Sequence, residues 1–201
     1  MNRKKREGTR PSPGRPRSRA AETAILDAAY HLLAERGLKK ATVEAIAAEA
    51  KVSKATIYKW WTGRAAVLMS AFLREARHAL PYPTALNAAE IERCLMAMAH
   101  QFRGPIGQMM AAIIAEGQVS EDFSHEFCQG YINARRADGV QLVQQGIDLG
   151  ILRPGNPHTI LDLLYAPLYY RLLVKHQPIT DAFVTEYVGL VLKGVLADDE
   201  T

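Results

Sequence analysis

The segment from Thr42 to Trp61 limits the fold of this chain more than any other, because it encodes two short helices joined by a tight turn. Thr42 is a good N-cap for the first helix and Ser53 for the second, since a side-chain hydroxyl can accept a hydrogen bond from a free amide at a helix start. Val52 and Ile57 flank the start of the second helix with the spacing of a hydrophobic staple. This helix is about eight residues or roughly 12 Å long, too short to be stable alone. The segment therefore predicts a helix-turn-helix supported by neighbouring helices.

The rest of the chain is also helical by its apolar spacing. The apolar residues between Ile25 and Leu33 share one face of a helix that Gly37 ends, and no strand-type alternation competes with this pattern. The sequence predicts an all-α fold of about nine helices, in which an N-terminal tri-helical head precedes a larger helical C-terminal domain. The later helices are expected at 64–79, 87–102, 121–146, 158–174 and 181–196, with one more starting at Pro105.

Positive charge is concentrated at the N-terminus, although the net formal charge of the whole chain is only +4. Residues 1–19 carry +7, residues 20–64 carry +2 and residues 65–201 carry −5. A basic end on an otherwise acidic protein indicates a polyanionic partner for that end, although a solubilising tail would show the same charge. Residues 1–17 are rich in Arg, Lys, Pro and Gly without apolar periodicity, which predicts a disordered basic arm.

Within the arm, the segment Gly14-Arg15-Pro16-Arg17 resembles the core of an AT-hook, an extended Arg-Pro segment that lies in a narrow minor groove. Arg15 and Arg17 are therefore expected to contact DNA. The sequence leaves open whether they insert into the groove or are attracted to phosphates in general. Removal of residues 1–17 is expected to weaken DNA binding and flatten its salt dependence, because fewer counterions are released.

The second short helix has one inward and one outward side. Ile57 and Trp61, four residues apart, are expected to face the head, which leaves the other side chains exposed. Cations, hydroxyls and aromatic rings are suited to phosphates and base edges, and in a tri-helical head this helix enters the major groove. The outward residues are Lys54, Ala55, Thr56, Tyr58, Lys59 and Trp60.

The run Thr42-Val-Glu-Ala-Ile-Ala-Ala-Glu-Ala-Lys-Val-Ser-Lys-Ala-Thr-Ile-Tyr-Lys-Trp-Trp-Thr-Gly-Arg64, followed by Val67-Leu68, resembles the signature of the tetracycline-repressor (TetR) family. The run Pro-Leu-Tyr-Tyr-Arg-Leu-Leu at 167–173 is similar to the penultimate helix of one branch of that family. The resemblance implies a homodimeric, ligand-responsive repressor of an inverted-repeat operator, released by a small apolar effector. It implies that Thr42, Tyr58 and Arg64 bind phosphates, and that the groove is faced by Lys54, Ala55, Thr56, Lys59 and Trp60.

The motif departs from the family pattern at four residues. Lys51 stands at the turn where the family usually has Gly, and a side chain in a left-handed conformation costs about 1 kcal/mol. Trp60 replaces the usual His, and the sequence leaves it open between contact with the DNA backbone and packing. Trp61 replaces the usual Phe and is expected in the core. Arg64 replaces the usual Lys, which keeps the charge and adds bidentate capacity toward phosphate.

The domain limits expected from this resemblance are a basic arm at 1–17, a helix-turn-helix DNA-binding domain at 18–63, and a ligand-binding and dimerisation domain at 64–201. The last two helices carry more apolar surface than one core requires, which favours a subunit interface over a monomeric core. The expected interface residues are Leu161, Leu164, Leu168, Leu172, Val184, Val188 and Val191. The expected ligand-pocket residues, which could equally be ordinary core, are Phe102, Arg103, Met109, Met110, Ile113, Phe127 and Tyr131.

Other function classes lack their signatures. There is no Gly-rich phosphate loop, no Gly-x-Ser-x-Gly elbow and no Cys–His pair in context, so an enzyme is not expected. Neither the six histidines nor Cys94 and Cys128 show metal-ligand spacing, and no metal or cofactor is expected. No apolar run of membrane-spanning length or secretory signal occurs, which predicts a cytoplasmic protein whose partners are double-stranded DNA, a second copy and a small effector. An activator, a regulator without a ligand and an architectural DNA-binding protein remain alternatives.

Overall fold

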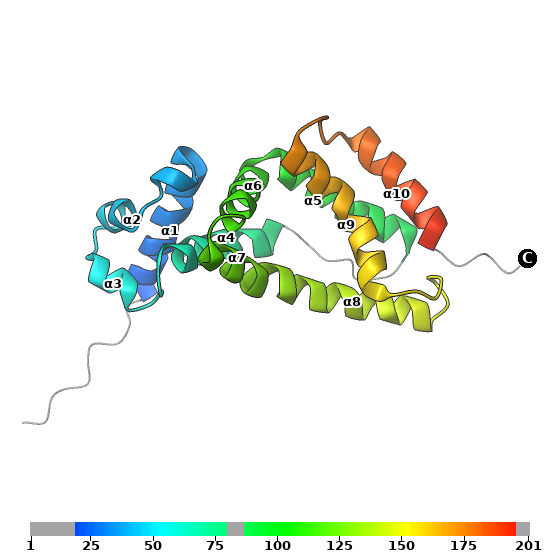
Figure 1. Ribbon diagram of the computed structural model, residues 1–201, viewed down its shortest axis with the longest axis horizontal. Helices are drawn as coiled ribbons and strands as arrows, with labels where there is room; N and C mark the ends of the chain where they lie inside the picture. The colour runs from blue at the N-terminus through cyan, green and yellow to red at the C-terminus, as the bar shows by residue number, and fades with distance from the viewer. Residues whose placement is uncertain (1–18, 80–86, 196–201) are drawn as a thin grey trace, which may run out of the picture.

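The computed structural model of the protein describes residues 19–79 and 87–195. The predicted arm, with Arg15 and Arg17, lies outside the described residues. The molecule is elongated, with a small helical head at one end and a larger helical body at the other, and the chain passes from head to body along one helix (Figure 1). No strand occurs in the described residues, which confirms the all-α prediction. In the same ranges, no helix combines the length and hydropathy of a membrane span, and no group of side chains is suited to hold a metal ion.

The head consists of three α-helices and one short turn of 3₁₀-helix. Thr42 and Ser53 cap the second and third helices as predicted, since each hydroxyl accepts a 3.2 Å hydrogen bond from the amide three residues on. Gly37 ends the first helix at a positive φ of 74°, a conformation that a residue without Cβ adopts freely. The elements are α1 (Arg19–Arg36), η1 (Leu38–Lys40), α2 (Val43–Glu49) and α3 (Lys54–Tyr58).

The body holds the remaining helices, and its boundaries follow the sequence signals closely. Asn87 caps α5 through a 2.9 Å bond from the Glu90 amide, and Pro105 occupies the first turn of α6. The elements are α4 (Arg64–Ala79), α5 (Ala88–Arg103), α6 (Pro105–Gly117), α7 (Glu121–Phe127), η2 (Cys128–Ile132), α8 (Asn133–Asp148), α9 (Pro157–Val174) and α10 (Asp181–Val195).

The helix predicted over 121–146 is present but interrupted. The segment η2 is a single π-helical turn between α7 and α8, where the Asn133 amide bonds to the carbonyl of Cys128, five residues back. Such a turn admits one extra residue into a helix and is frequent at functional sites. When α7, η2 and α8 are taken as one interrupted helix, the described residues hold the nine α-helices that the sequence predicts.

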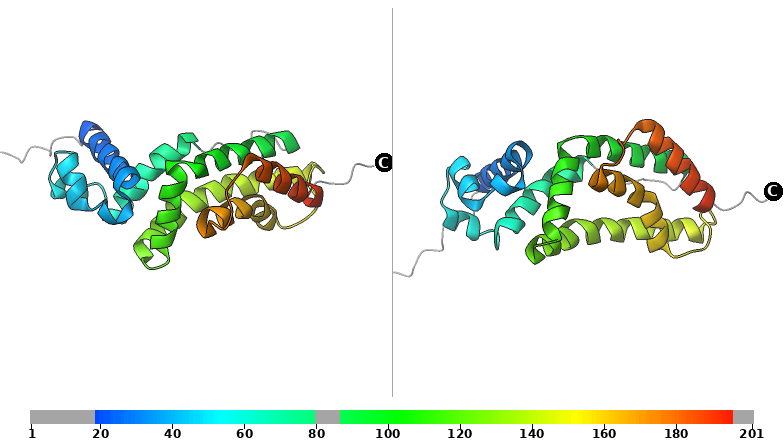
Figure 2. Two further views of the ribbon diagram at one scale, coloured as in Figure 1. Left: turned by 90° about the horizontal axis from the view of Figure 1, so that it is seen from above. Right: turned by 45° about the horizontal axis from the view of Figure 1, so that its top comes forward.

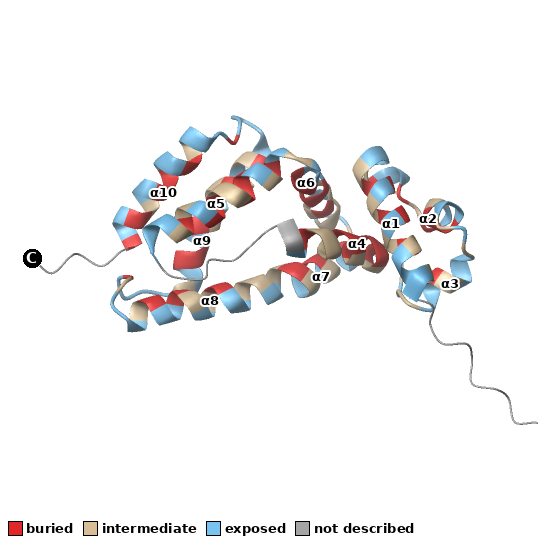
Figure 3. Ribbon diagram, turned by 180° about the vertical axis from the view of Figure 1, so that it is seen from behind, coloured by how far each residue is buried: buried red, intermediate tan, exposed pale blue. Residues whose placement is uncertain are grey.

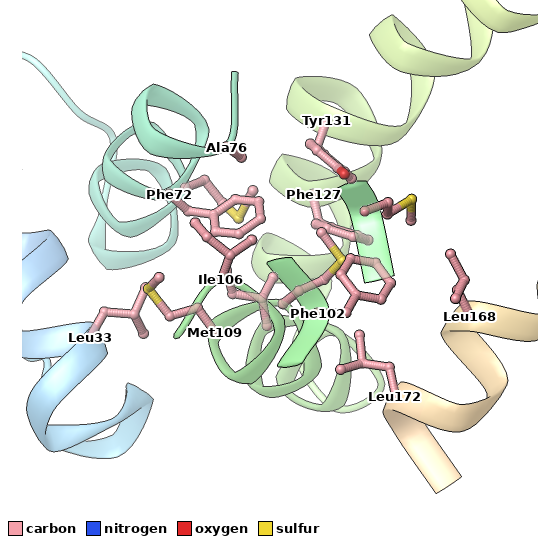
Figure 4. Packing of buried hydrophobic residues seen from close by; sticks show 14 of the residues in the cluster. Leu33, Phe72, Ala76, Phe102, Ile106, Met109, Phe127, Tyr131, Leu168 and Leu172 are labelled. Atoms are coloured by element: carbon pink, nitrogen blue, oxygen red, sulfur yellow. The ribbon is translucent and has the colours of Figure 1, made fainter. Parts of the chain in front are cut away.

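One continuous apolar core joins the head to the body. Leu33 of α1 lies near Met109 of α6, and Phe72 of α4 lies between this contact and the aromatic residues of α7 and η2 (Figure 4). The view from behind shows the same buried strip running from α1 through α4 and α6 (Figure 3). Helix α4 therefore packs against both parts of the molecule.

The sharp corner between α5 and α6 depends on a glycine. A Cβ added to Gly107 would lie 2.0 Å from the backbone oxygen of Phe102, closer than any side-chain carbon can come. The two helices can therefore meet at this corner only without a side chain at position 107. Because Phe102 is buried, the corner also fixes where α5 enters the core.

Candidate nucleic-acid interface and internal cavity

The third helix of the head presents a continuous exposed surface. Ile57 is completely buried beneath α3, as predicted, and fixes its rotation. Of the predicted outward residues, Thr56 and Trp60 are partly buried, and Tyr58 is 55% exposed although it is aromatic. The exposed surface consists of two lysines, an alanine and this tyrosine, a composition that suits contact with a polyanion better than burial in a protein core. The exposed members are Lys54, Ala55, Tyr58 and Lys59.

Lys54 is bound to a neighbouring helix. Its ammonium nitrogen lies 3.1 Å from the carboxylate of Glu44 on α2, and both side chains are more than half exposed. The pKa of Glu44 is lowered by a hydrogen bond from its own backbone amide first and by Lys54 second. The pair aligns α2 with α3 at the exposed edge, and a phosphate could replace the carboxylate as the partner of Lys54.

The turn between α2 and α3 has the left-handed residue that the usual family glycine suggests. Lys51 adopts φ 55°, which is left-handed, so the position does suit the glycine that the family usually has there. The amide of Val52 then bonds back to the carbonyl of Ala47 at 3.0 Å, closing the turn. A side chain in this conformation is strained, but the hydrogen-bonded geometry of the turn is complete.

The two tryptophans after α3 pack together. Trp61 is half-buried against α4, and its indole nitrogen donates a 2.8 Å hydrogen bond to the hydroxyl of Ser70. Trp60 lies against it with ring centroids 5.5 Å apart. Trp61 therefore anchors the head to α4, and Trp60 is held by that anchor while one side of it remains accessible.

The predicted phosphate contacts at Thr42 and Arg64 are used internally. The hydroxyl of Thr42 caps α2. The guanidinium of Arg64 donates to the carbonyl oxygens of Ala41, at 3.1 Å, and Leu38, and it lies 5.3 Å from the ring centroid of Phe123. The phosphate contact predicted for Arg64 would require its side chain to leave these carbonyls, because it turns inward at the start of α4. Its position after the motif could not reveal that two carbonyls of the head lie within its reach.

A cavity of about 80 Å³ lies in the body between α5, the π-turn, α8 and α9. Its wall combines apolar side chains with three tyrosines and two arginines. Of the predicted pocket residues it includes only Tyr131. The lining residues are Met98, Tyr131, Ile132, Arg135, Arg136, Leu161, Tyr165 and Tyr169.

The other predicted pocket residues are packed elsewhere. Arg103 lies outside this cavity and binds Asp181 of α10 at 2.5 Å, while it and Phe102 border an open groove at the start of α6. The remaining four fill the core, in which the close-up shows Met109 and Phe127 (Figure 4). These four residues pack in the core. The sequence could not show this, because an apolar residue on a helix face has the same spacing whether it lines a cavity or fills the core. These core residues are Met109, Met110, Ile113 and Phe127.

The phenol groups of the cavity are shielded from water. Burial raises the pKa of Tyr165 to about 12 and the pKa of Tyr131 and Tyr169 above the ordinary value, while the positive charge of Arg135 acts in the opposite direction. The side chains of Tyr131 and Tyr169 are hydrogen-bonded to each other. All three tyrosines are therefore neutral at physiological pH. Of the three, the sequence analysis named Tyr131 as a pocket residue, and Tyr169 lies in the family-like run at 167–173.

Tyr131 connects the cavity to α4. Its ring meets Phe72 edge-on, with centroids 5.6 Å apart, and stacks on Phe127 at 5.4 Å. Nearby, a Cβ on Gly130 would lie 3.1 Å from the Leu73 side chain, so the π-turn and α4 are closely packed. Tyr131 therefore lines the cavity and also packs against α4, the helix that follows the head.

The apolar stripe predicted for dimerisation faces inward instead. The four leucines of α9 are at most 6% exposed, Val184 and Val188 of α10 are buried, and Val191 is partly buried. They join α9 and α10 to α5 and α8 within one protomer. Helix α10 lies at the edge of the body (Figure 2), and exposed residues mark its outer surface (Figure 3). The outer side of the two helices still carries large apolar side chains, four on α9 and one on α10. This outer stripe consists of Leu163, Tyr170, Leu173, Val174 and Leu190, which are 42–64% exposed.

Comparison with known proteins gives a consistent result over nearly the whole chain. Residues 25–71 match the family described as bacterial regulatory proteins, tetR family, and residues 84–191 match the tetracyclin repressor-like C-terminal domain. YdeS of Bacillus subtilis, an HTH-type transcriptional regulator, is 38% identical over 190 residues, covering 94% of this chain and 96% of that protein.

Solved structures show the same similarity. The TetR family transcription regulator SCO0332 superposes with a TM-score of 0.75 at 30% identity, covering 87% of this chain and 98% of that one. A transcriptional regulator from Saccharomonospora viridis, solved in complex with choline, has a TM-score of 0.65 at 16% identity and covers 90% of this chain and all of that one. At that identity the likeness concerns the fold alone.

Proposed function

Because the chain belongs to the TetR family of helix-turn-helix transcription regulators, which bind DNA, we propose that it is a homodimeric repressor of an inverted-repeat operator. Release would follow the binding of a small effector in the body. In this proposal residues 18–63 are the DNA-binding domain and residues 64–201 the ligand-binding and dimerisation domain, and the protein acts in the cytoplasm.

The observation that carries the proposal is the exposed surface of α3. Lys54, Tyr58 and Lys59 are exposed on a helix whose rotation is fixed by the buried Ile57 and the Ser53 cap. A helix held so rigidly loses little conformational freedom on docking into a major groove. Of the predicted contacts, we retain Lys54, Ala55, Thr56, Tyr58, Lys59 and Trp60 as the groove and phosphate contacts, with Arg15 and Arg17 of the arm.

Dimerisation is supported by the outer stripe of α9 and α10, defined above. Four large apolar side chains exposed on α9 and one on α10 are of the kind that marks a subunit interface. Pairing about a twofold axis would bury the stripe of one protomer against the same stripe of its partner. It would also place two α3 helices to read the two half-sites of a near-palindrome, about one DNA turn apart or a little more.

Ligand response is supported by the packing between the cavity and the head. Tyr131 lines the cavity and contacts Phe72 on α4, and α4 begins at Arg64, whose guanidinium binds the carbonyls of Leu38 and Ala41. A ligand that repositions Tyr131 acts on α4 and so on the angle of the head. The choline-bound regulator of the same fold is an example of a small molecule held by this kind of helical protein.

Selection of binding sites from a random DNA pool tests the function directly. A repressor or activator with two α3 helices enriches an inverted repeat, whereas an architectural protein enriches no sequence. Transcription in vitro from a promoter that overlaps the enriched site then separates repression from activation. Failure to enrich any site would refute sequence-specific regulation by this protein.

A further inference from the structure

Among the described residues that line the cavity between α5, the π-turn, α8 and α9, the side chain of Tyr165 has a polar group without a partner. We propose that this cavity binds a small uncharged aromatic molecule, whose single hydrogen-bond acceptor is held by the hydroxyl of Tyr165. A ketone oxygen is an acceptor of this kind. The inference rests on the proposed function, because it names the chemistry of the effector that the proposed repressor would sense.

The hydroxyl of Tyr165 is shielded from bulk water but is not enclosed by protein atoms. Burial raises the pKa of Tyr165 to about 12, so the phenol keeps its proton at physiological pH. Within the described residues this hydroxyl has no hydrogen-bond partner, yet none of their side-chain oxygens and nitrogens is both fully enclosed and unpaired. The oxygen therefore keeps accessible surface, and that surface faces the cavity that Tyr165 lines. The O–H is a donor with nothing in the wall to donate to.

The other polar side chains of the described wall are already bound. The side chains of Tyr131 and Tyr169 are hydrogen-bonded to each other. Arg136 forms an ion pair with Asp162. Arg135 is engaged within the chain and lies 5.8 Å from the ring centroid of Tyr131. A charged ligand would have to break one of these pairings to gain a counter-ion, and a buried charge without one costs far more than a buried neutral group.

The rest of the wall suits a flat apolar body. Phe127 stacks on Tyr131 with ring centroids 5.4 Å apart. Phe102 meets Tyr169 edge-on, with centroids 5.2 Å apart. These two phenol rings are therefore held in place, and an aromatic ligand can pack against them without the cost of ordering them. The cavity volume of about 80 Å³ is roughly five to eight times the ~10–15 Å³ that one water requires, which suits one substituted ring.

The unpaired donor discriminates between ligands of the same shape. A hydrocarbon would leave the Tyr165 hydroxyl without a partner, whereas a ketone of equal size accepts its hydrogen bond. Replacement of Tyr165 by Phe should reverse this preference, because the ketone oxygen would still lose its water but would gain no donor in exchange. The order of the two affinities therefore reports on the hydroxyl itself.

The test uses isothermal titration calorimetry on the purified full chain with three compounds of matched size: acetophenone, ethylbenzene and benzoate. Acetophenone is expected to bind about fivefold to tenfold more tightly than ethylbenzene, equivalent to about 1–1.4 kcal/mol, and benzoate is not expected to bind. Equal affinities for acetophenone and ethylbenzene, tighter binding of benzoate, or no binding of acetophenone at millimolar concentration would each overturn the inference.

Variants assign the preference to one hydroxyl. Tyr165→Phe is expected to weaken acetophenone binding about tenfold while ethylbenzene binds at least as tightly as to the wild type. Tyr187→Phe is the matched control, because the Tyr187 hydroxyl already donates to the carbonyl of Leu164 at 3.2 Å and does not line the cavity. It should keep the wild-type preference. A Tyr165→Phe protein that still prefers acetophenone would overturn the inference.

Far-UV circular dichroism confirms that each variant is folded, and the comparison of the three compounds on the wild type is decisive even if a variant is not. A separate measurement keeps the two proposals distinguishable, namely the affinity for the selected operator with and without saturating acetophenone. Acetophenone binding without an effect on DNA affinity would support the ligand class and refute ligand-responsive regulation through this cavity. Operator binding in a protein that does not bind acetophenone would leave the DNA-binding function intact and refute the ligand class.

Discussion

The guanidinium of Arg64 lies 3.8 Å from the carboxylate of Glu116, so the first residue of α4 is linked to the end of α6. The same guanidinium donates to the carbonyl of Leu38 in the head. Arg64 is therefore a junction between the two parts of the molecule and has a structural partner on each side. Its expected phosphate contact would require it to leave both.

This junction predicts that Arg64→Gln lowers stability without changing how many phosphates the protein binds. Two backbone carbonyls would lose a charged donor, worth about 1.5–3 kcal/mol for each bond when buried and less here because Arg64 is 30% exposed. The expected result is a lower melting temperature and an unchanged slope of log affinity against log salt concentration.

Lys59→Gln is the control for Arg64, because Lys59 is exposed on α3 and belongs to the proposed DNA contacts. It should leave the melting temperature unchanged and reduce the salt slope by about 1. A reduction of that size in Arg64→Gln would show instead that Arg64 turns outward to a phosphate when DNA is bound.

Lys51→Gly is expected to leave the melting temperature unchanged or to raise it. The free energy of unfolding should rise by at most about 1 kcal/mol. The reason is that Lys51 has φ 55° and glycine enters that region without steric cost. Lys51→Ala removes the same charge but keeps the Cβ, and so should not gain stability. Differential scanning calorimetry without DNA compares the two, and a clear drop for the glycine variant would contradict the strain argument.

Gly107→Ala should destabilise the protein strongly, because its Cβ would lie 2.0 Å from the Phe102 carbonyl oxygen and the α5–α6 corner would have to open. Overpacking of this kind costs about 1–3 kcal/mol or more, a fall of several degrees in melting temperature for a chain of this size. Gly104→Ala, whose Cβ would meet Gln101 at an ordinary 3.6 Å, is the matched control. Equal melting temperatures for both variants would show that the corner is adaptable.

Leu163→Lys is expected to convert the proposed dimer into a monomer, because it places a charge in the outer stripe at a residue that is 48% exposed in the protomer. Leu149→Lys is the control, since Leu149 is 74% exposed at the end of α8 and lies outside the stripe. Analytical ultracentrifugation at micromolar concentration measures both. A Leu163→Lys protein that stays dimeric would place the interface elsewhere.

Stability is expected to fall as the pH rises above about 10. Burial raises the pKa of Tyr165 to about 12, whereas in the unfolded chain it ionises near 10, so between these values the unfolded state loses a proton that the folded state keeps. Urea denaturation at pH 9, 10 and 11 should show a falling midpoint. Tyr165→Phe should fall less steeply, and an equal slope would mean that Tyr165 does not contribute.

The head was predictable because its signals are local. The Thr42 and Ser53 caps and the inward Ile57 each depend on residues within one or two helical turns, and the structure confirms them. Even the left-handed turn at Lys51 could be inferred from the residue that usually stands there. Arg64 differed because its partners, the carbonyls of Leu38 and Ala41, are more than twenty residues away.

The cavity and the outer stripe were not predictable for the same reason. Helix α9 is apolar nearly all round, so its spacing contains two stripes, and only the packing of α5 and α8 against Leu164 and Leu168 decides which is internal. The cavity likewise depends on the π-turn, which redirects Tyr131. The residue types in Cys128–Ile132 do not predict a π-turn.

The two stripes of α9 assign the packing of the protomer and the proposed pairing of protomers to different residues, so that evolution can vary each set independently. The inner leucines are buried in the core of the protomer, whereas Leu163, Tyr170 and Val174 on the outer side are exposed. In a cell that contains several regulators of this fold, substitutions at the outer residues could forbid mixed pairs without weakening any protomer. A newly duplicated copy could thus acquire its own partner, and then its own operator, before its core changed at all.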